Sequence, residues 1–316
     1  MRKVALLYNP DSGGRRTQRQ PELDSVLTLL REARIEASLL LSELPGQAAE
    51  RVQQAILSGC DTVFACGGDG TIHNIVQVLA GSQVALAVLP LGTANALAHD
   101  LGLPLRPVAA ARAILNAIPR RVALGHIRYM DFDGHPASSY FIIAAGIGVD
   151  AHLFYKLNPS VKAKLGMGAY YAKAWHLWLT HRMRHFEAEF ATNGDAGTKR
   201  STLTELLAVR IRNFGGVLRE LAPGASLQND ELRLVLCESE KRASYLLYVL
   251  RALLGQRWNV PGVELADSKS VACRLPALET GATTASKVYV EADGELLGTL
   301  PAEITIVPDA VTILSP

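Results

Sequence analysis

A glycine-rich segment in the first third of the chain carries the residues best suited to chemistry. Gly67-Gly68-Asp69-Gly70-Thr71 follows an apolar run, Thr62 to Cys66, and opens a helical pattern of apolar residues. Glycines let backbone N–H groups approach a phosphate closely, and the positive end of a helix favours its negative charge. In such a loop Asp69 would bind Mg²⁺ through water or accept a proton from an attacking hydroxyl. The same residues also suit a plain tight turn from strand to helix.

A second polar loop follows the next buried strand. Pro90-Leu91-Gly92-Thr93-Ala94-Asn95 comes after the apolar run Val84 to Leu89. Gly92 permits a close backbone approach, and Thr93 and Asn95 would form hydrogen bonds to phosphate or ribose oxygens. Either side chain would also serve as a helix N-cap, a role compatible with phosphate binding. Since both loops follow strands of one predicted sheet, we expect them to face each other at its carboxyl edge.

The elements that must position these loops alternate between strand and helix. Strands are predicted at Val4–Tyr8, Ile35–Leu41, Thr62–Cys66 and Val84–Leu89, and helices at Gln20–Glu32, Gln47–Leu57 and Val108–Ala117, besides the helix that the glycine-rich segment opens. Short loops in this order predict a parallel sheet with helices on both faces. A third loop, Asn9 to Gly14, follows the first strand and would reach the same edge.

The pattern changes after about Val122, where short strand-like runs recur between turn signals. The runs are Val122–Phe132, Ser138–Ile147, Phe186–Thr192, Leu203–Arg212, Leu232–Glu238, Lys269–Arg274 and Lys287–Ala292, with helices near Met167–Arg184 and Ala243–Leu254. They predict a mostly antiparallel, β-sandwich-like second domain. The fold class is therefore α/β with two domains, a parallel α/β nucleotide-binding domain at 1–125 and a β-rich domain at 126–302. Residues 303–316 are expected to complete the first domain or to stay with the second.

Composition narrows the function classes. The 316 residues are 49% hydrophobic and 20% charged, which is typical of a packed globular protein and not of a disordered one. A net charge of +2 gives no support to a nucleic-acid partner, and none is expected. The four cysteines form no CxxC pair, which favours reduced thiols in the cytosol. Neither a Walker A sequence nor the protein-kinase signature set occurs, so those two kinase classes are disfavoured.

Three motifs taken together resemble the catalytic domain of the diacylglycerol-kinase and sphingosine-kinase family. They are Asn9-Pro10-x-Ser12-Gly13, Gly67-Gly68-Asp69-Gly70-Thr71 and Pro90-Leu91-Gly92-Thr93-x-Asn95-x-x-Ala98. The second motif alone would also admit relatives of NAD kinase and phosphofructokinase, and the third points to the lipid-kinase branch. Later segments continue the resemblance, Gly146 to Ala151 and Asp293-Gly294-Glu295 among them. The family fold is an α/β nucleotide-binding domain and a β-rich domain with the active site between them.

The resemblance implies a lipid kinase that uses ATP and Mg²⁺. Its nucleotide contacts would fall on Asn9, Ser12, Gly13, Ser42, Gly67, Gly68, Asp69, Gly70, Thr71, Gly92, Thr93 and Asn95. Glu295 or Asp69 would accept the proton of the lipid hydroxyl, although the residue types alone favour an ordinary hairpin turn at Asp293 and Glu295. A structural Mg²⁺ would be held by the Asp230 carboxylate and the backbone carbonyls of Leu227 and Leu232. This chain departs from the family at His73-Asn74, where Asn-Glu is common, and lacks an Asp-Gly pair beside Asp230.

A basic and aromatic segment is the candidate for contact with a lipid surface. Lys156 to His185 contains no acidic residue and interleaves six Lys or Arg with tyrosines and tryptophans. Such a segment suits an anionic membrane, or else forms a helix whose aromatic residues pack in the core.

The run after Met1 is too short for a signal peptide, so a cytoplasmic protein, peripheral on the inner face of the membrane, is expected. The alternatives are a soluble kinase of the NAD-kinase type and a non-catalytic nucleotide- or lipid-binding protein; the oligomeric state is open.

Overall fold

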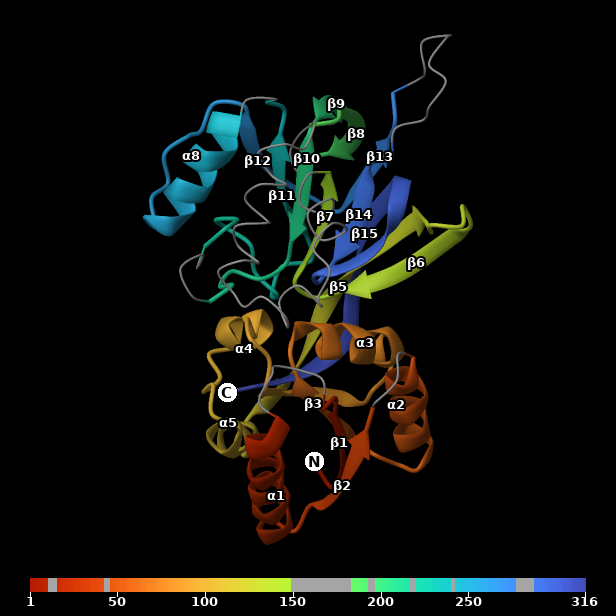
Figure 1. Cartoon of the computed structure of the whole chain (residues 1–316), viewed down its shortest axis with the longest axis vertical. Coiled ribbons are helices and arrows are strands. Elements are labelled where there is room, and N and C mark those ends of the chain that lie inside the picture. The colour runs from red at the N-terminus through yellow and green to blue at the C-terminus, as the bar shows by residue number, and fades with distance from the viewer. Residues whose placement is uncertain are drawn as a thin grey trace. The chain divides into compact units, whose positions relative to one another are not determined.

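The computed structural model describes residues 1–10, 16–42, 46–148, 183–192, 197–215, 220–239, 242–276 and 287–316. They fall into two compact units (Figure 1). The first contains Met1–Leu124, a short segment that begins at Ile211, and Val307–Pro316; the second contains Gly125–Arg210 and Glu220–Ile306. The segment at Ile211 falls within the predicted second domain, 126–302. It groups with the first because the Asp100 carboxylate accepts the backbone N–H groups of Arg212 and Asn213, both at 2.8 Å.

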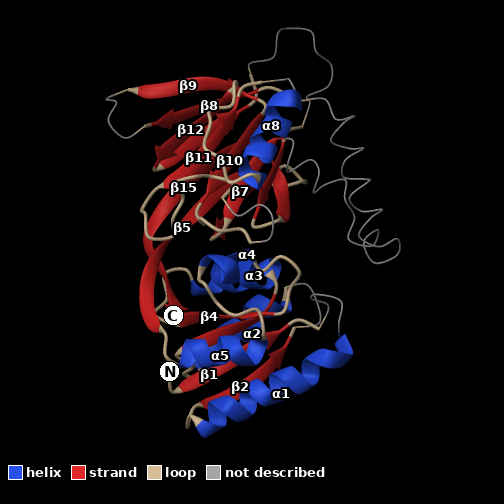
Figure 2. Ribbon diagram, turned by 90° about the vertical axis from the view of Figure 1, so that its left-hand side faces the viewer, coloured by secondary structure: helices blue, strands red, loops and turns tan. Residues whose placement is uncertain are grey.

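The first unit is built on a parallel sheet. Its strands are β1 (Lys3–Tyr8), β2 (Glu36–Leu41), β3 (Thr62–Gly67) and β4 (Ala85–Pro90), and its helices are α1 (Arg16–Glu32), α2 (Gln47–Leu57), α3 (Asp69–Leu79), α4 (Ala96–Asp100) and α5 (Pro107–Leu115). The strand order is β2-β1-β3-β4, and the end of β15 (Glu295–Ser315) pairs in parallel with β4. The connections through α1 and α2 run in opposite directions across the sheet. Right-handed crossovers therefore place these two helices on opposite faces (Figure 2).

The second unit consists mostly of antiparallel strands. They are β5 (Ile118–Met130), β6 (Pro136–Phe141), β7 (Ala144–Gly148), β8 (Phe186–Ala191), β9 (Thr198–Leu203), β10 (Glu205–Val209), β11 (Leu232–Cys237), β12 (Val263–Ser268), β13 (Ser270–Arg274) and β14 (Tyr289–Ala292), and the described residues also include helix α8 (Arg242–Leu253). The order β12-β11-β10-β7-β14-β15 is antiparallel throughout. Phe141, Phe186 and Phe190 are buried in its core. β5 and β15 contribute residues to both units.

A predicted strand is divided in two. The apolar run Ser138–Ile147 was expected to form one strand, but β6 ends at Phe141 and β7 begins at Ala144. The carboxylate of Asp293 accepts the backbone N–H groups of Ile142, Ile143 and Ala144, at 3.1, 2.8 and 3.2 Å. Because these N–H groups bond a side chain, they are not available to a neighbouring strand, and the chain bends there.

None of the helices in the described part of the chain is long and apolar enough to cross a bilayer.

Candidate functional site

The carboxyl ends of the parallel strands of the first unit meet at one edge of its sheet. Tyr8 is in register with Leu41 on one side and with Cys66 on the other, and Gly67 is in register with Pro90. The residues that follow these strands therefore start from the same edge. They include Asn9, Gly68 and Leu91, one from each of the three predicted phosphate loops, and Ser42, which follows β2. Ser42 is buried, and its N–H donates to the Tyr8 carbonyl at 3.0 Å.

The two glycine-bearing loops lie in direct backbone contact. The Leu91 N–H donates to the Gly67 carbonyl at 2.9 Å. A Cβ atom added at Gly92 would stand 2.4 Å from the Cα of Gly68, and one added at Gly67 would stand 2.2 Å from the Thr71 hydroxyl. Non-bonded atoms do not approach each other so closely, so both positions require glycine. The absence of a side chain at Gly92 therefore allows the backbones of the two loops to touch.

Helix α3 begins inside the glycine-rich segment. Gly68 is its N-cap residue and has no side chain with which to cap it. The Gly68 carbonyl accepts the N–H groups of Thr71 and Ile72, at 3.0 and 3.2 Å, which closes the first turn. The backbone N–H groups of an α-helix's first turn point outward along the axis and favour an anion. This end of α3 therefore has the geometry of a phosphate site.

Asp69 joins the two loops. Its carboxylate accepts the backbone N–H groups of Ala96 and Leu97, at 3.2 and 3.4 Å, at the start of α4. Asn95, the residue before α4, has a left-handed φ of 51° and forms no capping bond with its side chain. The carboxylate of Asp69 caps α4 in its place. Asp69 therefore fixes where the second loop lies, in addition to any contact it makes with a ligand.

The side chains of the second loop divide into an inner and an outer group. Asn95 is buried; its Oδ1 accepts the Gly92 N–H at 2.8 Å and its Nδ2 donates to the Gly92 carbonyl at 3.0 Å. Thr93 is exposed. Both residues were expected to bind phosphate or ribose. Asn95 instead shapes the loop through its bonds to Gly92, whereas Thr93 is exposed to solvent and to any ligand there.

Replacing Gly92 by alanine should disrupt both loops. The added Cβ would meet the Gly68 Cα at 2.4 Å and the Asn95 Oδ1 at 2.8 Å, and neither is the flexible end of a long side chain. We expect a loss of about 2–4 kcal/mol in unfolding free energy, the range of overpacked sites, and nucleotide binding at least tenfold weaker. Urea unfolding and nucleotide titration measure the two effects. Gly197→Ala is the matched control, because Gly197 lies outside the left-handed φ region and an added Cβ there meets nothing within 4 Å.

A cluster around His99 was not predicted from the sequence. The Asn213 amide donates to the His99 carbonyl at 3.3 Å, and Gly215, with φ 77°, lies against the His99 ring, where a Cβ would be 2.1 Å from Cδ2. Burial raises the pKa of the neighbouring Asp100, and its bonds from Asn213 and Arg212 act against that rise. The segment Asn213 to Gly215 contains none of the predicted site residues. Nothing local in the sequence links that stretch to residue 100.

In the second unit Asp293 and Glu295 have different surroundings. Asp293 is buried and anchors the bend between β6 and β7, whereas Glu295 is exposed at the first position of β15. Asp293 and Gly294, with φ values of 51° and 84°, form the hairpin turn that the Asp-Gly pair indicated. Glu291, a buried carboxylate that sequence analysis did not select, accepts the Gly294 N–H at 2.9 Å. It lies where a side chain on Gly146 would be, 2.7 Å from that position, which explains this glycine.

Some predicted residues lie outside the part of the chain that the structure describes. Ser12 and Gly13 are among them, as is nearly all of the candidate lipid-contact segment Lys156 to His185. Asp69 and Glu295, the two candidate proton acceptors, belong to different units. The choice between them stays a prediction.

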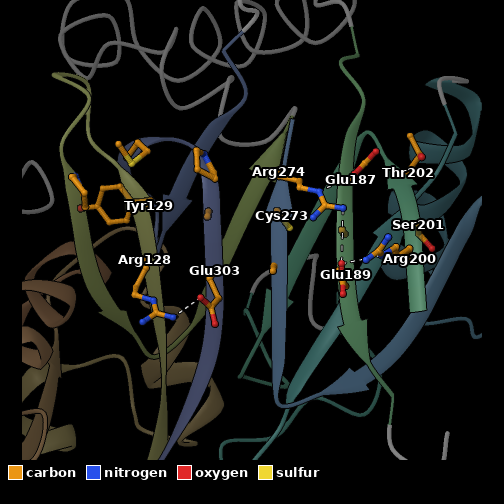
Figure 3. A pocket seen from close by; sticks show the side chains of 16 residues that line it. Arg128, Tyr129, Glu187, Glu189, Arg200, Ser201, Thr202, Cys273, Arg274 and Glu303 are labelled. Carbon is orange, nitrogen blue, oxygen red and sulfur yellow. Dashed lines mark hydrogen bonds and ion pairs between the residues drawn. The ribbon is translucent and has the colours of Figure 1, made fainter. Parts of the chain in front are cut away.

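A surface groove of about 540 Å³ crosses the strands of the second unit (Figure 3). Its arginines are each paired with a carboxylate: Arg128 with Glu303, Arg200 with Glu189 at 3.0 Å, and Arg274 with Glu187 at 2.9 Å. The bond to Glu187 raises the pKa of Arg274. Since the charges balance in pairs, the groove does not favour a phosphate over other ligands. Exposed pairs of this kind contribute about 0–1 kcal/mol each to stability.

Comparison with known proteins gives consistent matches along the chain. The family model for "Diacylglycerol kinase catalytic domain" matches residues 3–127, and that for "YegS C-terminal NAD kinase beta sandwich-like domain" matches residues 144–315. Proteins named diacylglycerol kinase are similar in sequence. The one from Bacillus subtilis is 28% identical over 96% of this chain and 93% of its own, and the one from Mycobacterium tuberculosis is 26% identical over 99% and 95%.

Solved structures match the fold. A diacylglycerol kinase structure from Bacillus anthracis covers 99% of this chain and 97% of its own with a TM-score of 0.70 at 18% identity. Yeast NADH kinase in complex with NADH covers 100% and 84% with a TM-score of 0.53 at 11% identity. The expected fold class, an α/β domain with a β-sandwich-like domain, is confirmed.

Proposed function

Because the chain belongs to the diacylglycerol kinase family, we propose that it is a kinase that transfers the γ-phosphoryl group of ATP, bound with Mg²⁺, to the hydroxyl of diacylglycerol or a related lipid. The observation that carries the nucleotide half of this proposal is the pair of glycine loops in contact at the sheet edge. The start of α3 lies in one of them, and the Thr93 hydroxyl lies exposed on the other.

The residues of the first unit supply positioning and electrostatics, which phosphoryl transfer mainly requires. The N–H groups at the start of α3 orient the phosphates, and Thr93 adds a hydrogen bond from the second loop. Asp69 keeps the loops in place through Ala96 and Leu97. Its carboxylate and the Thr93 hydroxyl are oxygen donors of the kind that Mg²⁺ and its bound waters prefer. Mg²⁺ neutralises phosphate charge when it is bound with the nucleotide.

The lipid hydroxyl must lose its proton as it attacks the phosphorus. Glu295 is our proposed acceptor, because it is an exposed carboxylate whereas the carboxylate of Asp69 is engaged with the backbone of α4. The proton passes to the carboxylate, the new O–P bond forms, and ADP leaves with the electrons of the broken bond. A peripheral position on the inner face of a membrane follows from such a substrate.

A soluble kinase of the NAD-kinase type is the second candidate. It is favoured by the likeness to yeast NADH kinase and by the name of the C-terminal domain family. Both candidates share the phosphate site and differ only in the acceptor.

The acceptor is identified by incubating the protein with γ-labelled ATP, Mg²⁺ and either mixed micelles of hydroxylated lipids or aqueous NAD. We expect label in diacylglycerol or a related lipid, and its loss in Asp69→Ala. Label in NAD alone would transfer the assignment to the second candidate. No label in any acceptor, with nucleotide still bound, would leave a non-catalytic binding protein.

A further inference from the structure

A buried arginine stands where the family resemblance led us to expect a structural metal ion. Arg210 directly follows β10 and is completely buried. Its Nη1 donates to the carbonyls of Asn229 and Glu231, both at 2.6 Å, and its Nη2 donates to the Leu227 carbonyl at 3.2 Å. Three alternate carbonyls of one loop thus converge on a single positive group.

The charge of this group persists at neutral pH. Burial lowers the pKa of Arg210 to about 10, and the charge of Asp230 acts in the opposite direction. A group with that pKa remains protonated near pH 7. The loop from Leu227 to Glu231 therefore encloses a cation that is part of the chain itself.

The residues at this loop do not fit a structural Mg²⁺. The Leu227 carbonyl, one of the expected ligands, is hydrogen-bonded to the guanidinium. Asp230, the expected carboxylate, is exposed. Among the residues that the structure describes, no group of three or more His, Cys, Asp or Glu side chains is placed to hold a metal ion. A divalent ion beside a buried guanidinium would also meet strong like-charge repulsion.

We propose that the Arg210 guanidinium replaces the structural cation, so that this loop is ordered without metal. The physical equivalence is direct, because carbonyl oxygens that would coordinate a hard cation also accept charge-assisted hydrogen bonds. The N–H of Arg210 donates to the Ile143 carbonyl at 2.9 Å, so the backbone that carries the charge is fixed to the neighbouring strands. The proposal does not depend on which acceptor the kinase uses.

The first test uses the unaltered protein without nucleotide. We expect no stoichiometric metal by elemental analysis after purification without chelator. We also expect the thermal midpoint to shift by less than about 1 °C between chelator and excess Mg²⁺, because a ligand stabilises only a state that binds it. Bound metal in a one-to-one ratio, or a midpoint that falls on chelation and returns with Mg²⁺, would overturn the proposal even if every variant failed to fold.

The second test removes the charge. Arg210→Met keeps much of the length but leaves three carbonyls without a donor, and we expect the thermal midpoint to fall by more than about 5 °C. Arg210→Ala leaves room for an external cation, and added guanidinium at non-denaturing concentration or Mg²⁺ should recover part of its loss. Arg233→Ala is the matched control, because Arg233 bonds the Pro223 carbonyl of the same turn but is ion-paired with Asp267. Equal recovery of this control, or full stability of Arg210→Met, would contradict the proposal.

A separate observation concerns helix α8, whose apolar residues face outward. Leu246, Leu247, Val249, Leu250, Leu253 and Leu254 are each 40–56% exposed, and Trp258 beyond the helix is 41% exposed. The inward face carries Ser244, Tyr248, Arg251 and Ala252, all buried, with the Arg251 guanidinium 4.2 Å from the centre of the Tyr248 ring. The helix lies at the flank of the second unit beside β12 (Figure 1). A contiguous exposed apolar face of this kind marks a binding surface.

The residue types around this face indicate its partner. Lys241 to Val263 contains four basic residues, of which Arg251 is buried on the inward face, and Glu240 and Glu264 flank the stretch. Arg257 is exposed, although it also pairs with Glu220 at 3.2 Å. Exposed apolar side chains on one helix face, with a tryptophan at the margin, match the interface of a bilayer. We infer that the outer face of α8 docks on a phospholipid surface; its purpose, to reach a lipid substrate, rests on the proposed function.

Flotation with phosphatidylglycerol vesicles tests this docking surface. The protein should partition onto these vesicles, and Leu246→Gln/Leu250→Gln/Leu253→Gln should reduce partitioning at least about tenfold. Leu57→Gln, at a leucine 83% exposed in the first unit, is the matched control. Unchanged partitioning of the triple variant would refute the inference, as would a dimer that the triple variant dissociates. Binding to vesicles without phosphorylation of any acceptor would refute the proposed function and leave the docking surface standing.

Discussion

Glu295→Gln should reduce kcat by about 10²–10⁴-fold, the contribution typical of general acid–base catalysis. The amide has nearly the same shape as the carboxylate but does not accept the proton that the attacking hydroxyl loses. Glu295 is exposed, so the substitution should leave the unfolding free energy within about 0.5 kcal/mol of the parent. KM for ATP should also stay unchanged, because Glu295 belongs to the second unit and the phosphate loops to the first.

Steady-state kinetics on the lipid identified above measure this effect. Glu238→Gln is the matched control, another exposed glutamate of the second unit, directly after β11. An unchanged kcat in Glu295→Gln would remove Glu295 from the reaction and leave Asp69 as the proton acceptor. A raised KM with unchanged kcat would instead indicate that Glu295 contributes only to binding.

The phosphate loops were predictable from sequence because their signals are local. Each buried strand is a short apolar run, each loop begins at its end, and parallel strands place those ends at one edge. A close backbone approach at these glycines was predicted, but the residues that they approach were not. Gly92 approaches the backbone of Gly68, and Asp69 binds the start of α4. The partners in each pair lie 24 to 28 residues apart in the sequence. Packing between segments sets such pairs, and composition does not encode them.

The second unit was less predictable because its decisive contacts are longer in range. Ile142 and Ile143 read as the middle of one strand, and only the carboxylate of Asp293, 150 residues away from Ile143, interrupts it. Arg210 lies within the predicted strand Leu203–Arg212, and the three carbonyls that accept its hydrogen bonds come from a loop 17 to 21 residues later. Single polar residues in apolar runs, Arg210 among them, are the only sequence signal that such sites leave.

Asp293→Ala should destabilise the second unit by about 3–5 kcal/mol, the cost of removing a buried charged partner. Three backbone N–H groups at Ile142, Ile143 and Ala144 would lose their acceptor. Alanine also disfavours the left-handed φ of 51° that Asp293 adopts. Urea unfolding measures the change, and an unfolding free energy within 1 kcal/mol of the parent, on the order of one hydrogen bond, would contradict the anchoring role.

Asp293→Asn isolates the hydrogen bond to Ile142. Asparagine tolerates the left-handed conformation and keeps one oxygen, which suffices for the Ile143 and Ala144 N–H groups that share Oδ1. Its NH₂ group would face the Ile142 N–H in place of Oδ2, so a loss of about 1–2 kcal/mol should remain. If alanine and asparagine cost the same, the bond to the Ile142 N–H accounts for the whole loss, and neither the two Oδ1 bonds nor the backbone conformation contributes. Because Glu295 directly follows the turn formed by Asp293 and Gly294, any loss of turnover in Asp293→Asn should grow with temperature as the turn unfolds. The loss in Glu295→Gln should have a similar size at every temperature.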